Sequence, residues 1–188
     1  MLLGALLPLG LFLFPLWNIT LEAPQYPTPL GMDIYINDFS DVNPFDIKNI
    51  NLMNHYVGMK YIPESIPEFK IFPAGIIITS LIGVLIAFRM RYTWYLIWGI
   101  LMVLLSTAGL YDFYLWEYDY GNNLNPRAIM KFTNPDGTIM GFQPPLFGTK
   151  RILNFTASSY PRLGAVFLGV GILASFVAFF FGRKEQFR

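Results

Sequence analysis

Four long runs of apolar residues dominate the pattern of hydrophobic and polar positions along the chain. They cover Leu2–Ile19, Pro73–Phe88, Thr93–Tyr111 and Leu163–Phe181, and none of them contains a charged side chain. About 20 mostly apolar residues allow a helix to cross the hydrocarbon core of a bilayer. The pattern therefore predicts four transmembrane helices, of which the second is slightly short.

The first apolar run could be mistaken for a signal peptide, but it has no basic segment before it and is longer than a typical signal core. We therefore expect an uncleaved membrane anchor. Pro8 and Pro15 would kink this helix, which neighbouring helices can accommodate. Its charge-free start at Met1 leaves open whether the natural N-terminus lies further upstream.

The basic residues in short loops predict the orientation in the membrane. The link 89–92 and the tail 182–188 hold five of the thirteen basic residues and one of the twelve acidic ones. We therefore expect both termini in the cytoplasm and two long loops in the periplasm, with the chain in a bacterial inner membrane. The predicted segments are transmembrane helices 1–19, 72–88, 93–111 and 163–181, periplasmic loops 20–71 and 112–162, the link 89–92 and the tail 182–188.

The two long loops carry their own signals of secondary structure. Alternation over Met32–Asn37 predicts a short strand, and Phe45–Lys60 is expected to be a helix. The third transmembrane helix should continue through Tyr120, and a turn at 134–137 suggests a hairpin of 129–133 with 138–142. The predicted fold class is an all-α membrane protein with four transmembrane helices and a small mixed α/β or irregular ectodomain formed by both loops.

Composition restricts the possible chemistry. Charged residues make up 13% of the chain, about half the usual share, and the net charge of +1 gives no reason to expect a nucleic-acid partner. Cysteine is absent, which excludes disulfides and thiolate metal sites. His55 is the single histidine, so no complete nucleophile–base–acid set can be named. We therefore do not expect an enzyme, and the lipid bilayer is the first expected partner.

A possible metal site surrounds His55. If its segment is helical, His55 and Met59 share a face, and if it is extended, Met53 shares that face with them. Imidazole and thioether ligands suit Cu(I), and Met32 or Met140 could complete such a site. The alternative is that His55 is only hydrogen-bonded and that the methionines fill gaps in a core.

A second cluster follows the third apolar run. Asp112 and Asp119 are seven residues apart and nearly aligned on a helix, with Trp116 between them. The carboxylates could be hard metal ligands or proton acceptors, because an acid near a membrane tends to face a partner or a wet cavity. The favoured interpretation is that they are interfacial acids paired with Arg127 or Arg162.

Several short motifs together resemble one family of small four-helix membrane proteins from Bacteroidetes-type bacteria. Many members lie in nitrous-oxide-reductase gene clusters, near copper-delivery and cytochrome c components. The resemblance covers nearly the whole chain, although typical members begin with a few basic residues that this chain lacks. The motifs are Ala23–Pro27, Asn54–Tyr56, Gly58–Lys60, Pro67–Lys70, Asp112–Tyr114 with Trp116, Tyr118–Gly121, Gln143–Leu146 and Leu153–Phe155.

The resemblance implies a periplasm-facing accessory protein for the maturation of a copper enzyme or for its electron supply. Its partner would be that enzyme or a cytochrome c, and its cofactor would be Cu(I). The rival interpretation is a structural or docking subunit of a larger respiratory or transport complex, without a metal of its own. A quinol-linked electron-transfer component ranks last. The positions associated with the family pattern are His55, Met59, Met32, Met140, Asp112, Trp116 and Asp119.

Overall fold

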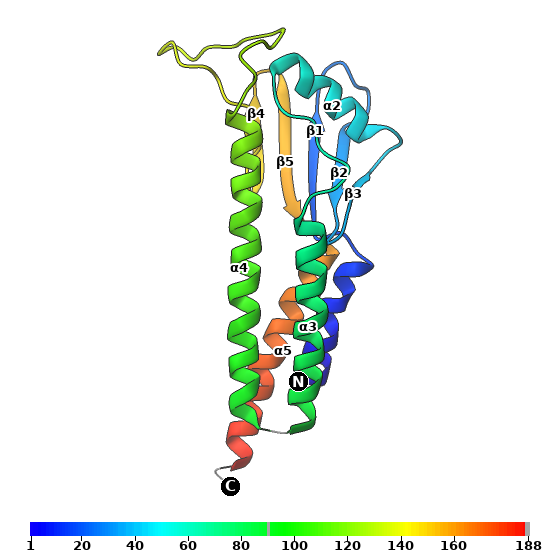
Figure 1. Cartoon of the computed structure of the whole chain (residues 1–188), viewed down its shortest axis with the longest axis vertical. Helices are drawn as coiled ribbons and strands as arrows, with labels where there is room; N and C mark the ends of the chain where they lie inside the picture. The colour runs from blue at the N-terminus through cyan, green and yellow to red at the C-terminus, as the bar shows by residue number, and fades with distance from the viewer. Residues whose placement is uncertain (90, 187–188) are drawn as a thin grey trace.

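The computed structural model describes residues 1–89 and 91–186. Met90 of the predicted link, and Phe187 and Arg188 of the predicted tail, lie outside the described residues. The chain forms an elongated helical bundle with a small domain of strands at one end (Figure 1). We call this end the head domain, and define it as the five strands, helix α2 (Asp46–Val57) and the outer end of helix α4 (Tyr92–Asn122) from Asp112 onward.

Three helices among the described residues are long and apolar enough to cross a membrane. They are α3 (Glu68–Arg89), α4 (Tyr92–Asn122) and α5 (Leu163–Gln186). Only 17–22% of the residues in their apolar windows are buried inside the structure, as expected for helices whose outer faces contact lipid. The chain is therefore a membrane protein with three candidate membrane-spanning helices, which match the second, third and fourth predicted helices.

The first predicted helix differs from the structure. Helix α1 (Leu2–Leu6) is followed by the 3-10 helix η1 (Leu7–Phe12), and strand β1 (Trp17–Glu22) begins where the prediction still had helix. Eleven helical residues span about 20 Å, which is less than the roughly 30 Å of a hydrocarbon core. Pro8 at the start of η1 and Pro15 after it explain why the helix tightens and then ends.

Small residues let the helices of the bundle approach closely. Gly83 of α3 lies against Ala5 of α1 and the indole ring of Trp98, because a Cβ atom at Gly83 would be 2.7–2.9 Å from their atoms. Gly4 and Gly171 bring α1 against α5 in the same way. Such contacts replace the hydrophobic effect as the driving force for helix association in lipid.

The described residues form one antiparallel sheet of five strands in the order β3-β2-β1-β5-β4. The fold class is therefore mixed α/β, which corrects the all-α prediction and agrees with its mixed ectodomain. Only one of the five strands was predicted, because the other four are only three to seven residues long and lack the long periodic pattern of the helices. Besides β1, the strands are β2 (Leu30–Ile34), β3 (Phe39–Asp41), β4 (Gly148–Ile152) and β5 (Phe155–Pro161).

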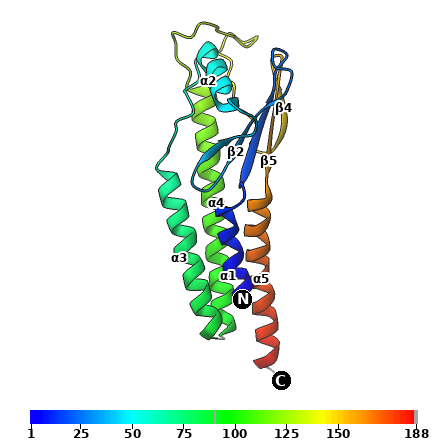
Figure 2. The same cartoon turned by 90° about the vertical axis from the view of Figure 1, so that its right-hand side faces the viewer.

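The core of the head domain lies between the sheet and two helices, α2 (Asp46–Val57) and the outer end of α4, as Figure 2 shows. Alternate residues of β1, namely Trp17, Ile19 and Leu21, turn toward this core. Two hydrophobic clusters fill it. Cluster A contains Leu30, Met32, Ile34, Ile50, Ile62 and Tyr120, and cluster B contains Phe142, Ile152 and Ala157.

Helix α4 continues without a break from the bundle into the head domain. Its 31 residues span about 46 Å, so roughly a third of its length extends beyond a 30 Å hydrocarbon core. The predicted continuation through Tyr120 is confirmed. The helix ends at Asn122, and Gly121 in its last turn allows the segment 142–147 to cross the helix. A Cβ atom at Gly121 would be 2.3 Å from the Cα of Gln143. We call residues 142–147 the strap.

The local predictions in the loops are confirmed in part. The strand predicted at Met32–Asn37 is β2, shifted toward the N-terminus, and the helix predicted at Phe45–Lys60 is α2. Helix α2 ends early because Gly58 adopts φ +82°, a left-handed conformation that favours glycine. The expected hairpin of 129–133 with 138–142 is reduced to one bridge between Thr133 and Ile139.

Candidate functional site

The structure places His55 on the exposed side of α2, away from the core of the head domain. Its ring stacks on that of Tyr61, with the ring centroids 6.0 Å apart and the planes 23° apart. Tyr56 lies beside it, with centroids 6.3 Å apart. His55 is therefore part of an exposed aromatic group.

Of the four methionines of the predicted copper site, Met32 is buried and the other three, Met53, Met59 and Met140, are half-buried. Met32 is 2% exposed and belongs to cluster A, against which Met53 and Met59 also pack. Met140 packs on cluster B, which Met59 also contacts. The structure thus gathers thioethers around the two clusters but puts the imidazole on another surface. Gly58 explains this, because the helix ends before Met59 and the i, i+4 relation between His55 and Met59 is lost.

The acids at the outer end of α4 do not pair with the predicted arginines in the way that the sequence suggested. Asp119 forms an ion pair with Lys60, which links α4 to the segment after α2. This hydrogen bond with Lys60 lowers the pKa of Asp119. Arg162, one of the two predicted partners, instead forms an ion pair with Asp33. The distance from Arg162 Nε to Asp33 Oδ1 is 3.8 Å.

Trp116 packs among other aromatic rings, and Asp112 does not share the ion pair of Asp119. The ring of Trp116 lies 4.3 Å from that of Tyr120 and 5.8 Å from that of Phe39, so it joins α4 to the sheet. Asp112 is half-buried and has no ion pair among residues 1–89 and 91–186. Within those ranges no three His, Asp or Glu side chains come together as a hard-metal site.

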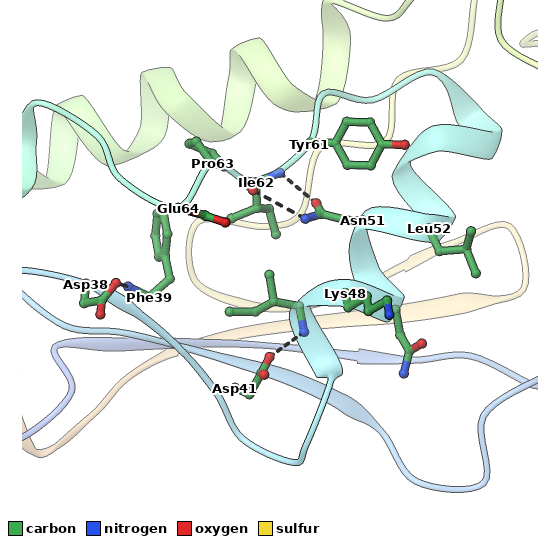
Figure 3. Close-up of a pocket in the computed structure, with 12 residues that line it drawn as sticks. Asp38, Phe39, Asp41, Lys48, Asn51, Leu52, Tyr61, Ile62, Pro63 and Glu64 are labelled. Atoms are coloured by element: carbon green, nitrogen blue, oxygen red, sulfur yellow. Dashed lines mark hydrogen bonds between the residues drawn. The ribbon is translucent and has the colours of Figure 1, made fainter.

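A pocket that the sequence did not reveal opens between α2, β3 and the segment Tyr61–Glu64 (Figure 3). Its volume is about 770 Å³. Three carboxylates line it, from Asp38, Asp41 and Glu64, together with a single basic side chain, Lys48. The apolar part of the lining includes Phe39, Ile47, Leu52, Tyr61, Ile62 and Pro63. We call this the acidic pocket.

Hydrogen bonds fix the walls of the acidic pocket. The Asn51 side chain accepts from the Ile62 amide at 2.7 Å and donates to the Ile62 carbonyl at 3.4 Å, as the dashed lines in Figure 3 show. The Tyr120 hydroxyl donates to the Tyr61 carbonyl at 2.8 Å. Asp41 Oδ1 accepts from the Ile47 amide at 2.6 Å, at the start of α2. The pocket is therefore preformed, which lowers the entropy lost when a ligand binds.

The carboxylates of this pocket differ in whether they already accept hydrogen bonds from the protein. Asp41 uses one oxygen to hold the start of α2, and Asp38 Oδ1 accepts from the Phe39 amide at 2.8 Å. Glu64 is exposed at the rim. With Lys48 counted, the lining keeps an excess of negative charge, so the pocket favours a cationic group next to an apolar one.

Glu117 is the most unusual acid of the head domain, and no motif pointed to it. It is 0% exposed, and neither carboxylate oxygen has a hydrogen-bond partner among the described residues. One turn before it, Phe113 contacts the ring of Trp17, and one turn after it, Gly121 meets the strap. Glu117 thus lies on the face of α4 that is covered by the head domain. Burial raises the pKa of Glu117 to about 8.

Comparison of the chain with protein-family models, with curated proteins and with solved structures gave no match.

Proposed function

We propose that this protein is a docking subunit of a larger membrane complex, and that its acidic pocket binds a basic segment of a partner protein. The observation that carries the proposal is the preformed pocket with three carboxylates and one lysine over an apolar floor. Lysine and arginine side chains combine an apolar stem with a charged end, which suits such a lining. The acidic composition of the first long loop supports the same choice of partner.

The orientation in the membrane is part of the proposal. The basic residues of the link and the tail favour a bacterial inner membrane with both termini in the cytoplasm. The head domain would then face the periplasm and meet a periplasmic or membrane partner there. A copper enzyme or a cytochrome c is the partner implied by the family resemblance.

The docking proposal predicts charge-selective binding of a short peptide. The full-length protein in detergent is titrated with a fluorescent octapeptide of alternating Arg and Ala, and anisotropy is measured. The double variant Asp38→Asn, Glu64→Gln should bind it about tenfold more weakly, because each exposed ion pair contributes roughly 0.2–1 kcal/mol. Asp41 is left unchanged because it holds α2.

Two controls decide the result. Glu22→Gln removes an exposed carboxylate from the end of β1, outside the pocket, and should leave binding unchanged. A peptide with Glu in place of Arg should not bind. Equal binding of both peptides, or equal loss in the double variant and in Glu22→Gln, would exclude the acidic pocket as a basic-segment site.

We propose Cu(I) handling as a second candidate function, because Met32, Met53 and Met59 pack on one cluster. Three neutral thioethers form a soft site that could release its metal to an acceptor enzyme. His55 lies outside this group and would contribute only after a rearrangement around Gly58. Apart from the shared cluster, this candidate rests on the family resemblance.

The copper proposal predicts one tight equivalent of Cu(I) in an anaerobic titration of the purified protein. The double variant His55→Ala, Met59→Ala should lose it, and Met59→Leu alone should weaken it by at least about tenfold, since a soft ligand is removed. Met130→Leu replaces an exposed methionine outside both clusters and is the matched control. Unchanged copper binding in the double variant would remove this function.

A further inference from the structure

A second, smaller pocket lies at the free edge of strand β4, beside the last turn of α4. Its volume is about 310 Å³, at the lower end of the roughly 300–1,000 Å³ of small-molecule sites. Its lining contains two cationic side chains, Lys150 and Arg151, and none of its eight lining residues is acidic. Three side-chain amides complete the polar part, those of Asn122, Asn134 and Gln143.

The two cations keep most of their donors available. Lys150 Nζ donates to the Gln143 carbonyl at 3.2 Å, and Arg151 Nε donates to the Leu153 carbonyl at 3.3 Å. An ammonium group has three donors and a guanidinium has five, so several remain on each. Within residues 1–89 and 91–186, neither Lys150 nor Arg151 forms an ion pair.

The position at a sheet edge explains how both neighbours can line one pocket. Successive residues of a strand point to opposite faces of the sheet. Because β4 pairs with β5 on one side only among the described residues, Lys150 and Arg151 can reach around its other edge. The amide of Gln143 accepts from Asn122 Nδ2 through its oxygen at 3.2 Å, which leaves its N–H₂ group as a donor.

The C-terminal end of α4 lies at this pocket, and the partial negative charge of a helix C-terminus favours cations over anions. Its strength is about half an elementary charge, and it comes from carbonyls without partners. Here the carbonyls of Tyr118, Asp119 and Gly121 accept from Asn122 Nδ2, the Asn123 amide and the Phe142 amide. The two full positive charges of the pocket therefore outweigh the helix end.

The nearest acids along the chain are engaged elsewhere. Asp119 pairs with Lys60, and Asp136 accepts from the amide and hydroxyl of Thr138. Glu22 is on the same sheet face as Arg151 but is separated from it by Thr156 of β5. The pocket thus keeps a net positive charge, because no carboxylate among the described residues forms an ion pair with Lys150 or Arg151.

We infer that this pocket binds a small phosphate-type oxyanion, held by Lys150 and Arg151 with the Gln143 amide as a neutral donor. Guanidinium and ammonium groups form charge-assisted hydrogen bonds with such anions. The pocket lies at the end of α4, ten residues or about 15 Å beyond Asp112, which is too far from the bilayer for a lipid headgroup. The ligand is therefore a free, soluble anion, and the site is independent of the acidic pocket.

Inorganic phosphate is the probe for this site. The full-length protein is purified in detergent without phosphate, and thermal unfolding is followed as phosphate replaces chloride at constant ionic strength. We expect saturable stabilisation of the wild type. Lys150→Gln and Arg151→Gln should each weaken the apparent affinity about fivefold or more, the loss expected for one charge-assisted hydrogen bond in an open pocket.

The control variant is Lys131→Gln, a basic residue of the same outer segment that does not line the pocket. It should leave the phosphate affinity unchanged. Stabilisation that does not saturate, or that falls equally in Lys131→Gln, would show a general charge effect and overturn the proposal. A response to short-chain phosphatidate but not to phosphate would overturn the assignment of a free anion.

Discussion

Replacing Trp98 with alanine is expected to destabilise the helical bundle by about 3 kcal/mol, near the lower end of the range for buried tryptophans. Trp98 is 1% exposed, and its indole N–H donates to the Thr79 carbonyl of α3 at 2.8 Å. The variant would leave a cavity between α1, α3 and α4 and would remove the hydrogen bond that joins α4 to α3. Because the bundle lies in lipid and not in water, the free energy of transferring the indole ring contributes less to this loss. The loss of van der Waals contacts around the ring is unaffected.

Thermal unfolding in detergent micelles measures this effect. Trp94→Ala is the matched control, because Trp94 lies one turn earlier on the same helix and is 47% exposed. It should change the free energy of unfolding by well under 1 kcal/mol. Similar losses in the two variants would mean that Trp98 does not hold the helices together.

The second large effect concerns Glu117, whose burial should make the stability of the head domain fall as the pH rises. Burial raises the pKa of Glu117 from 4.5 to about 8. Below pH 4.5 the carboxyl is protonated in both the folded and unfolded states. Between pH 4.5 and about 8 the folded protein retains a proton that the unfolded chain has released. Stability therefore decreases there by up to about 1.4 kcal/mol per pH unit, and a few kcal/mol are lost in total.

Glu117→Gln should remove this slope, because glutamine is neutral and similar in shape. The variant should equal the wild type near pH 4.5 and unfold several degrees higher at pH 8. Thermal unfolding at a series of pH values tests this, with Glu22→Gln as the exposed control. A wild-type slope that persists in Glu117→Gln would assign the pH dependence to another group.

The long helices were predictable because a chain in lipid must satisfy its backbone hydrogen bonds within each helix, which demands long apolar runs. The length of the apolar run also made the first predicted helix too long. Trp17, Ile19 and Leu21 continue the apolar run in sequence, yet they belong to a strand that faces a core. Over so few residues, composition alone does not separate a buried strand from the end of a membrane helix.

The candidate sites were less predictable, because they depend on how separate segments meet. The helical alternative for His55 and Met59 required an unbroken helix, which the left-handed Gly58 interrupts, and the extended alternative does not apply because His55 lies within α2. The acidic pocket exists because Asn51 binds the backbone of Ile62, eleven residues away. The spacing of charges along the chain contains no signal for such a contact.

The unbroken course of α4 makes it a rigid lever between the bilayer and the head domain. A helix about 46 Å long moves its outer end by about 4 Å when it tilts by 5° about its inner end. Helices tilt in response to the thickness of the surrounding membrane. Because Trp116 and Asp119 fasten this outer end to the sheet and to Lys60, the head domain would move with it. Bilayer thickness would thereby set the height and angle of the acidic pocket relative to the membrane surface.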